Sequence, residues 1–286
     1  MSESPQRRAW RVTEPLHAMI YFVPEAPARY AELGVGPMEG YFASRGAVFG
    51  ECGPGVVAAT FYNFNPEMIA RALPAAWDST TPDAMLEARL SAADAALTRG
   101  LGADVLASPE VAEAAGLARR AAEAATAWPQ GRPLFAAHAE LPWPEPPHLV
   151  LWHAQTLLRE FRGDGHVAAL LAAGIGGTEA LVLHVASGDM DERFLRVSRG
   201  WRREAWATAA EGLRERGLLD AEGGLTDAGR ALRAEVEAAT DRMADPAYDA
   251  IGTDACVRLA ELTRPLSRTV VKAGMLNPNS SMGRAQ

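Results

Sequence analysis

The strongest constraint on the fold is a stretch of sequence that occurs twice. Residues 33–47 read LGVGPMEGYFASRGA, and residues 173–187 read AGIGGTEALVLHVAS. Both contain Gly, a β-branched residue, Gly, two further residues, Glu and then an apolar run, and they lie 140 positions apart. Self-similarity at a fixed spacing is typical of repeated structural units. The sequence therefore predicts that the chain contains two copies of one unit.

Two further segment pairs support this prediction. Residues 88–101 align with residues 205–218, and residues 111–126 align with residues 225–240. Alanine-rich helices match by chance easily, so the support comes from the common order of the three pairs. In this alignment the first half carries an insertion between its first and second segments.

Four prolines lie in the segment LPWPEPPHL, residues 141–149. Prolines break helices and favour extended linkers. The sequence therefore predicts an N-terminal unit at 10–140 and a C-terminal unit at 148–275. A polar tail is expected at 276–286.

Helical spacing of apolar residues runs through the C-terminal unit. Four helices are expected there, over residues 148–163, 165–174, 177–186 and 202–217. Gly163 is expected to end the first of them. Short strands at 218–219 and at Leu225 flank the turn AEGG, and Thr226 is the predicted N-cap of the next helix. Helix, strand, turn, strand and helix in this order form the wing of a winged helix.

The stretch LRERGLLDAEGGLTDAGRAL, residues 213–232, resembles MarR-type winged-helix proteins. That family usually has an arginine at the tip of the wing, whereas this turn carries Asp220 and Glu222. Over its full length the chain is also similar to an uncharacterised bacterial family of tandem helix-turn-helix proteins. MarR-type proteins are homodimers, so the resemblance implies a pseudo-dimer within one chain. The expected fold class is mainly α, with two tandem winged-helix-like units from an internal duplication and short β-wings.

The insertion of the first half lies within residues 48–82. We expect a strand over VVAATFY, residues 56–62, after a Gly-Pro-Gly turn. Asn65 and Pro66 are predicted to open a helix as N-cap and first residue, and Thr81 is predicted to cap the next helix. The first unit is thus expected to contain a segment that its sister lacks.

Aromatic residues are concentrated in the N-terminal unit. Rings with a few polar groups among them are typical of a small-molecule pocket, but a bulky core would use the same residues. The candidate ligand-binding residues are His17, Tyr21, Phe22, Tyr41, Phe42, Arg45, Phe61, Asn63 and His153. His17 and His153 occupy matching places on the first helix of each unit, where a structural hydrogen bond is the other expected role.

Arginines are concentrated in RFLRVSRGWRRE, residues 193–204, before the fourth helix of the C-terminal unit. In winged-helix proteins this place belongs to the helix that reads DNA, and arginines at a helix N-terminus bind phosphates or guanine edges. The candidate DNA-binding residues are Arg196, Arg199, Arg202 and Arg203. A solvated surface with acidic partners such as Asp191 and Glu204 is the alternative. The aligned segment of the first unit, 78–90, is acidic and the net charge is −8, which argues against two equivalent DNA readers.

No catalytic signature accompanies these features. Asp164 and His166 are candidates for an acid–base pair, although an N-cap role explains Asp164 as well. The sequence has no metal-ligand spacing, P-loop or dinucleotide fingerprint, so neither a metal nor a cofactor is predicted. Cys52 and Cys256 are expected to be packed or free thiols. Without a signal core or a long apolar run, the chain is expected to be cytoplasmic and not to bind a membrane.

Three functions fit these patterns. The first is a transcriptional regulator that binds DNA through its C-terminal unit and senses a small aromatic or apolar molecule in its N-terminal unit, as a monomeric pseudo-dimer or a weak dimer. The second is a winged-helix fold that does not bind DNA and instead binds, sequesters or transforms such a metabolite. The third is a protein–protein adaptor that uses the same surfaces.

Overall fold

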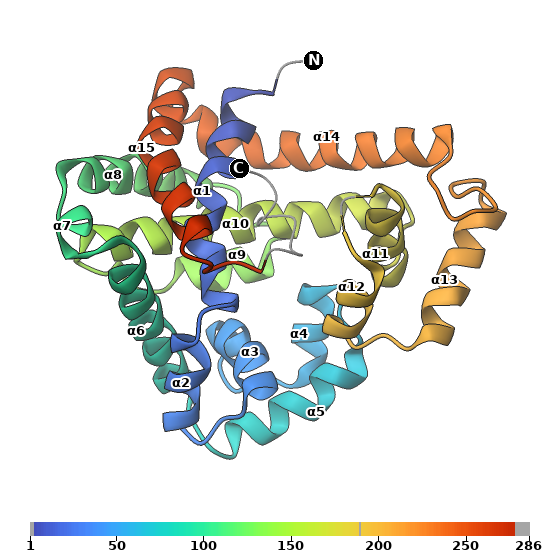
Figure 1. Cartoon of the computed structure of the whole chain (residues 1–286), viewed down its shortest axis with the longest axis horizontal. Coiled ribbons are helices and arrows are strands. Elements are labelled where there is room, and N and C mark those ends of the chain that lie inside the picture. Colours follow the sequence, from blue (N-terminus) through green and yellow to red (C-terminus); the bar gives the residue numbers. More distant parts are fainter. Residues whose placement is uncertain (1–2, 189, 278–286) are drawn as a thin grey trace.

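The computed structural model describes residues 3–188 and 190–277, and this part of the chain is helical without a β-sheet (Figure 1). Its first half contains α1 (Pro5–Ala18), α2 (Glu25–Glu32), α3 (Pro37–Gly46), α4 (Pro54–Phe61), α5 (Pro66–Trp77), α6 (Pro82–Leu101), α7 (Ala103–Leu106), α8 (Pro109–Ala125) and α9 (Pro133–Ala139). Its second half contains α10 (Pro147–Ala172), α11 (Gly177–Ala186), α12 (Glu192–Ser198), α13 (Arg203–Glu215), α14 (Asp227–Asp249) and α15 (Thr253–Lys272). Short 3-10 turns follow α1 and α3, at Met19–Tyr21 and Ala47–Phe49. The prediction of a mainly helical protein is confirmed.

Several helices begin where the sequence predicts. The side chain of Asn65 accepts a hydrogen bond from the backbone N–H of Glu67, and Thr226 accepts one from Gly229. Thr81 caps α6 in the same way. These side chains satisfy N–H groups that have no partner within their own helix, which fixes the helix starts.

Residues 147–172 form one continuous helix, so the predicted break at Gly163 is wrong. The glycines of this segment allow close packing and do not end the helix. A Cβ atom at Gly165 would lie 3.1 Å from a guanidinium nitrogen of Arg132 and 3.2 Å from the Cβ of Met243. The apolar face continues beyond the glycines to Leu170, so burial keeps the segment helical.

The strand predicted over residues 56–62 is also wrong, because this segment forms most of α4. Pro54 is the first residue of the helix, where its missing N–H costs nothing. Val57 and Phe61 are four residues apart and both are buried, so they share one face of a helix. β-branched residues favour strands only when burial alternates, and here the burial follows the helical period.

The predicted wing of the second half is reduced to one antiparallel bridge, between Leu219 and Leu225. The carboxylate of Asp220 accepts a hydrogen bond of 2.7 Å from the backbone N–H of Gly224 and closes the turn. In the first half only residues 78–81 join α5 to α6. The described part of the chain therefore holds a single wing-like turn, which is acidic, and no wing follows α5.

The apolar side chains form two separate cores. The larger core combines α1 to α9 with the first part of α10, the end of α14 and α15, and its fully buried rings include Phe42, Phe135 and Phe161. The smaller core lies among the end of α10, α11 to α13 and the start of α14, around Trp206 and Leu213. The boundary between the two cores thus falls within α10.

The helices from the two ends of the chain pack against each other in a reciprocal way. The most extensive helix pairs are α1 with α15 and α10 with α8. The hydroxyl of Ser267 on α15 donates a hydrogen bond of 2.6 Å to the carbonyl of Val12 on α1. Each pair therefore joins a first-half helix to a second-half helix, and Figure 1 shows α1 lying beside α15.

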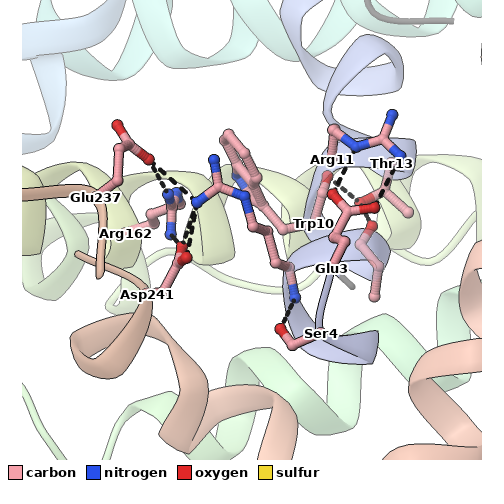
Figure 2. A network of polar contacts seen from close by, with 10 residues as sticks. Glu3, Ser4, Trp10, Arg11, Thr13, Arg162, Glu237 and Asp241 are labelled. Atoms are coloured by element: carbon pink, nitrogen blue, oxygen red, sulfur yellow. Dashed lines mark hydrogen bonds and ion pairs between the residues drawn. The ribbon is translucent and has the colours of Figure 1, made fainter. Parts of the chain in front are cut away.

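An ion-pair network fixes α1 and α10 to α14. Arg7 and Arg162 both contact the carboxylates of Glu237 and Asp241, at 2.6 to 3.2 Å. Figure 2 shows this network, in which the Arg162 guanidinium also lies 4.3 Å from the centre of the Trp10 ring. Shared carboxylates with partly buried partners form a stronger link than isolated surface pairs.

Two further findings concern membrane-spanning helices and the state of the cysteines. None of the helices in the described ranges is by itself long and apolar enough to cross a membrane. Helices α10 and α11 reach that hydropathy only when taken together, and they meet at a bend of 96°. Both cysteines are free thiols, with Cys52 half-buried and Cys256 buried.

Candidate functional site

Five pairs of consecutive helices in the described part of the chain are joined by four residues, and two of these pairs occupy the same place in their halves, directly after the helix that follows the repeated glycine stretch. Helix α12 ends at Ser198 and α13 begins at Arg203. Helix α4 ends at Phe61 and α5 begins at Pro66. In a helix-turn-helix motif two helices are joined by a turn of three or four residues, and we take these two pairs as the motifs of the two halves. The second helices of the two pairs are α5 and α13.

The two motifs bury the same positions. The buried or half-buried residues of α5 that face inward are Ile69, Ala72, Leu73 and Ala76, and those of α13 are Trp206, Ala209, Ala210 and Leu213. Each member of the second set lies 137 positions after its counterpart in the first. The same register of burial means that α5 and α13 pack their motifs in the same way.

The repeated glycine stretch also has the same local structure in both halves. Gly34 and Gly174 both have a positive φ, of 76° and 65°, which a glycine adopts without strain. The N–H of Val35 donates to the carbonyl of Tyr30 at 3.0 Å, and the N–H of Ile175 makes the equivalent bond at 2.9 Å. Helices α3 and α11 begin directly after these turns. The strongest segment pair of the sequence thus corresponds to one turn that is formed twice.

The second and third segment pairs fall on helices at different places in this order. For the second pair, residues 88–101 lie on α6, whereas residues 205–218 lie on α13. For the third pair, residues 111–126 lie mainly on α8, whereas residues 225–240 lie mainly on α14, the helix directly after α13. The motif order pairs α13 with α5, so the segment interpreted as an insertion, 48–82, contains the helix-turn-helix motif of the first half. The misalignment has a simple cause, because alanine-rich helices match one another in many registers.

The turns of the two motifs are in direct contact. The backbone N–H of Asn65 donates to the carbonyl of Arg199 at 2.9 Å, and its side-chain amide donates to the carbonyl of Gly200 at 2.9 Å. In return, the indole N–H of Trp201 donates to the carbonyl of Asn63 at 2.8 Å. We call this contact between residues 62–65 and 199–202 the turn junction. As a result, α5 begins at the junction, and α13 begins just after it and runs in a different direction (Figure 1).

Two further contacts tighten the turn junction. The Tyr62 hydroxyl donates a hydrogen bond of 2.5 Å to the carbonyl of Ile175. A side chain at Gly177 would collide with the backbone of Tyr62 and Asn63, so this close approach requires glycine. The first turn of α11 is therefore part of the junction.

The four candidate DNA-binding arginines have two different surroundings. Arg202 and Arg203 are exposed at the start of α13. Arg196 is half-buried and forms an ion pair of 3.5 Å with Glu192. Arg199 is also half-buried, and its guanidinium lies 4.5 Å from the centre of the Phe64 ring. Only Arg202 and Arg203 are therefore placed like groups that contact a partner from solution.

The rest of the exposed face of α13 carries acidic residues. Glu204, Glu211 and Glu215 are exposed along this helix. Arg214 points its guanidinium at Glu211, at 3.0 Å. Along α13, the positive charge without an acidic partner among the described residues is thus confined to the N-terminal end.

Several candidate ligand residues form an aromatic cluster under α3 and α4. The rings of Tyr41, Phe42, Phe61 and Phe64 have centroid separations of 5.2 to 6.1 Å, and Tyr21 joins them 5.7 Å from Tyr41. Phe42 is completely buried and Phe61 is 5% exposed. The rings pack against one another, as in a core. Phe22 is half-buried against the same core, and Asn63 lies in the turn junction.

Arg45 brings charge into this aromatic cluster. Its guanidinium lies 4.0 Å from the centre of the Phe61 ring, donates to the Tyr41 hydroxyl at 3.2 Å and pairs with Glu160 at 3.5 Å. Burial alone would raise the pKa of Tyr41, but the positive charges of Arg45 and Arg199 outweigh it and lower this pKa. The cluster is therefore a place where negative charge on an oxygen is stabilised.

His17 connects the aromatic cluster to α10. Its Nε2 lies 3.1 Å from the Tyr21 hydroxyl, and its Nδ1 lies 3.0 Å from the hydroxyl of Thr156. Thr156 donates its own hydrogen to a backbone carbonyl of α10, so Nδ1 is the donor in the second contact and Nε2 accepts from Tyr21. Burial lowers the pKa of His17 well below its ordinary value, and nearby arginines lower it further, so the ring is neutral. His17 therefore makes structural hydrogen bonds, which was the alternative to a ligand-binding role.

His153 is also buried and lies on α10, but it has other partners. Its ring meets the edge of Trp143 at a centroid distance of 4.8 Å. Burial lowers the pKa of His153 to about 4, with a further contribution from the charge of Arg89. The two histidines that match in sequence therefore have different partners, and the structure does not bring them into one contact pair.

Asp164 and His166 each have a partner of their own. The Asp164 carboxylate accepts a hydrogen bond of 2.9 Å from the N–H of Phe135 and so caps α9 from a different helix. Burial raises the pKa of Asp164 to about 7. His166 contacts the hydroxyl of Thr240 at 2.9 Å. Asp164 thus has a capping role, although it caps a helix other than the predicted one.

Sequence reasoning missed three buried basic residues: Arg162 in the ion-pair network, and Arg89 and His138. Arg89 is 3% exposed and His138 is 1% exposed, both in the larger core. A signal was present for Arg89, because it lies four residues after Met85 and three before Ala92, on the apolar face of α6. His138 likewise follows the buried Leu134 by four residues on α9.

The comparisons with known proteins are brief. No curated protein and no solved structure matches the chain. A model of a helix-turn-helix family matches residues 6–277, a region that includes both motifs and both cores. Such a family suggests a regulator that binds DNA. The chain belongs to this helix-turn-helix family.

Proposed function

We propose that this protein is a DNA-binding regulator in which the start of α13 contacts the phosphate backbone. The exposed guanidiniums of Arg202 and Arg203 carry the proposal. The N-terminal end of a helix has a partial positive charge and free N–H groups, so arginines there add to an existing preference for anions. Arg193 on the preceding helix is exposed as well and extends the same basic surface.

The two motifs are not equivalent DNA readers in this proposal. The exposed face of α5 has one arginine, Arg71, beside Glu67 and two prolines. In dimeric readers the two helices enter major grooves about 34 Å apart. Here α5 and α13 begin at the turn junction, so they cannot enter successive grooves in this arrangement. We infer that α13 reads DNA alone, or that the turn junction opens when the protein binds.

The matching turns and burial patterns favour an origin by duplication. A MarR-like pseudo-dimer fits the reciprocal packing of α1 on α15 and of α10 on α8, since in a twofold interface each contact between two elements occurs twice with the subunits exchanged. The two units proposed here are the predicted 10–140 and 148–275, with the helix-turn-helix motifs α4–α5 and α12–α13 as their centres.

Regulation by a small molecule would act through the turn junction. Arg199 belongs to the junction and packs on Phe64, while Phe64 packs on the aromatic cluster that contains Tyr41. A ligand that moves this cluster would therefore change how α13 is presented. Coupling of this kind requires that the ligand binds the two arrangements with different affinity.

The test is a gel-shift series with the DNA upstream of the gene, over a range of salt concentrations. Arg202→Ala and Arg203→Ala should each weaken binding and reduce the slope of log K against log salt by about 1, as expected for one phosphate contact. Arg258→Ala on α15 is the matched control, because it removes the same charge far from α13. Equal effects from all three variants, or no binding at low salt, would contradict the proposal.

A second candidate function is supported by the acidic surface. Glu204, Glu211 and Glu215 on α13, together with Asp220 and Glu222 on the turn, would repel a phosphate backbone. This observation favours a protein that keeps the fold but binds, sequesters or transforms an aromatic or apolar metabolite. Native mass spectrometry of the purified chain separates the two candidates, because only the second requires a small molecule bound to a protein that fails the gel shift.

A further inference from the structure

Several buried side chains have nitrogen atoms without hydrogen-bond partners among the described residues, and four of them belong to one part of the larger core. They are Arg89 on α6, His138 on α9, and Trp152 and His153 on α10, and none is more than 5% exposed. Within residues 3–188 and 190–277, no partner is found for Nε and Nη2 of Arg89, for either ring nitrogen of His138, for Nε1 of Trp152 or for Nε2 of His153. Buried polar groups are almost always paired, so a group of them without partners requires an explanation.

These side chains lie together. The Arg89 guanidinium is 5.2 Å from the centre of the Trp152 ring. The charge of Arg89 acts on both histidines, and His138 and His153 are close enough to influence each other. The four residues thus form one cluster, which we call the donor cluster.

The donor cluster lacks a negative charge, and its only acceptors are the unprotonated ring nitrogens of His138 and His153. In the described structure, the residues whose charges act on His138 and His153 are arginines and a histidine, and Nε and Nη2 of Arg89 have no carboxylate partner. Burial lowers the pKa of His138 well below its ordinary value and that of His153 to about 4, so both rings are neutral at pH 7. The cluster therefore has the single positive charge of Arg89, which is costly to bury without a counter-ion.

Elsewhere in this chain, the Nε and Nη2 atoms of arginines, which are unpaired in Arg89, bind carboxylates. Arg11, Arg99 and Arg258 each direct Nε and Nη2 at the two oxygens of one carboxylate, on Glu3, Glu25 and Glu113 respectively. For Arg258 both bonds measure 2.8 Å. This side-on geometry suits a carboxylate because its two oxygens match the two parallel N–H groups. Arg89 presents the same two atoms inside the core.

We propose that the donor cluster binds a small monocarboxylate. Nε and Nη2 of Arg89 would take the two carboxylate oxygens, and the indole N–H of Trp152 with a ring N–H of His138 or His153 would donate to the remaining lone pairs. One negative charge neutralises the one positive charge of the cluster. Because all four side chains are buried, we take the smallest carboxylates, formate and acetate, as the candidate ligands. The proposal does not depend on whether the protein binds DNA.

Acetate is the probe for the first experiment. The full chain is dialysed into a buffer without carboxylates, and its thermal unfolding is followed while sodium acetate, sodium chloride or sodium phosphate is added at matched ionic strength. Acetate should raise the melting temperature above the values in chloride and phosphate, because a ligand that binds only the folded state stabilises it. Titration calorimetry should give one site per chain.

Two variants locate the site. Arg89→Met retains the length of the side chain and removes a buried unpaired charge, so it should fold, and acetate should bind it roughly tenfold to a hundredfold more weakly. Arg99→Met is the matched control on the same helix, since Arg99 pairs with Glu25 at the surface. Its acetate affinity should equal that of the unmodified chain.

A third measurement does not need a variant. Nuclear magnetic resonance of the histidine ring protons in the unmodified chain should show that acetate raises the pKa of His153, because a nearby negative charge favours the protonated ring. The proposal is overturned by an unmodified chain in which acetate has no more effect than chloride, by binding of phosphate in place of acetate, or by unchanged acetate affinity in Arg89→Met.

Discussion

The two helix-turn-helix motifs have the same turn length and bury the same positions, but their surroundings differ. Helices α4 and α5 are packed into the larger core through Phe42, Phe61 and Phe64. Helices α12 and α13 have a small core of their own, a wing-like turn and exposed arginines. One local architecture thus supports two roles, and the surrounding residues decide which. The first motif is a support for the fold, and the second presents a surface.

The largest expected difference between the motifs concerns stability. Phe42→Ala removes a fully buried ring from the larger core and should cost about 3–5 kcal/mol of the free energy of unfolding of the whole chain. Leu213→Ala should cost about 2–5 kcal/mol, but mainly within the smaller core. Urea unfolding with hydrogen exchange measures both. Loss of protection over the whole chain in Leu213→Ala would show that the two cores do not unfold separately.

Acid should destabilise the larger core, which surrounds the first motif, before the smaller core, which surrounds the second. His17, His138 and His153 lie in the larger core, and burial lowers the pKa of each. The unfolded chain binds protons near pH 6.5, so the stability due to these neutral rings is complete above that pH and is lost as the pH falls below it. Between pH 7 and pH 5 the loss should be about 2 kcal/mol for each histidine.

Two variants check this pH dependence. His153→Phe should reduce the loss between pH 7 and pH 5 by about 2 kcal/mol in urea titrations at the two pH values. The raised pKa of Asp164, about 7, acts in the opposite direction, because its acid form is favoured in the folded state and acidification strengthens it. An Asp164→Asn variant should therefore lose more stability in acid than the unmodified chain. An identical pH profile for all three proteins would contradict the assignment.

The turn junction should respond to one added methyl group. Gly177→Ala places a Cβ atom against the backbone of Tyr62, and we expect it to cost about 1–3 kcal/mol and to separate the motifs. Gly116→Ala is a control of opposite sign, since no atom lies within 4 Å of a Cβ at this exposed helical position. It should stabilise the chain by about 0.5–1 kcal/mol. Thermal unfolding of both variants gives the comparison, which fails if Gly177→Ala is neutral.

The smallest expected effect measures the polar part of the turn junction. Asn65→Ala removes the cap of α5 and the hydrogen bond to Gly200, whereas Thr81→Ala removes only the cap of α6. Each cap contributes about 1 kcal/mol, and the additional hydrogen bond contributes about 1 kcal/mol more. Chemical denaturation should therefore show a larger loss for Asn65→Ala. Equal losses would mean that the junction bond adds nothing to stability.

The parts of the fold that local chemistry determines could be predicted from the sequence. The helical class, the caps at Asn65, Thr81 and Thr226 and the repeated glycine turn depend on residues a few positions apart. The continuity of α10 could not be predicted, because Gly165 is explained by Arg132 and Met243, which are distant in the sequence. A glycine alone does not reveal whether it ends a helix or lets another chain segment approach.

The candidate sites show the same division. The exposure of Arg202 and Arg203 follows from their place before α13, which the sequence indicated. The turn junction depends on backbone groups of residues 62–65 and 199–202, and backbone carbonyls leave no trace in the sequence. The position of Arg89 on an apolar helix face was visible, but its meeting with His138 depends on how α6 and α9 pack on α10.

The reciprocal pairing of α1 with α15 and of α8 with α10 has a consequence for cleavage of the chain. Residues 140–146 join α9 to α10, and residues 145–146 among them are exposed, so a protease that cuts there leaves one fragment with α1 and α8 and another with α10 and α15. Each fragment then supplies one member of both helix pairs, and the two should co-elute as a complex in size-exclusion chromatography. The peptide link between the halves would thus be dispensable once the protein has folded, as in split proteins that assemble from separately expressed pieces.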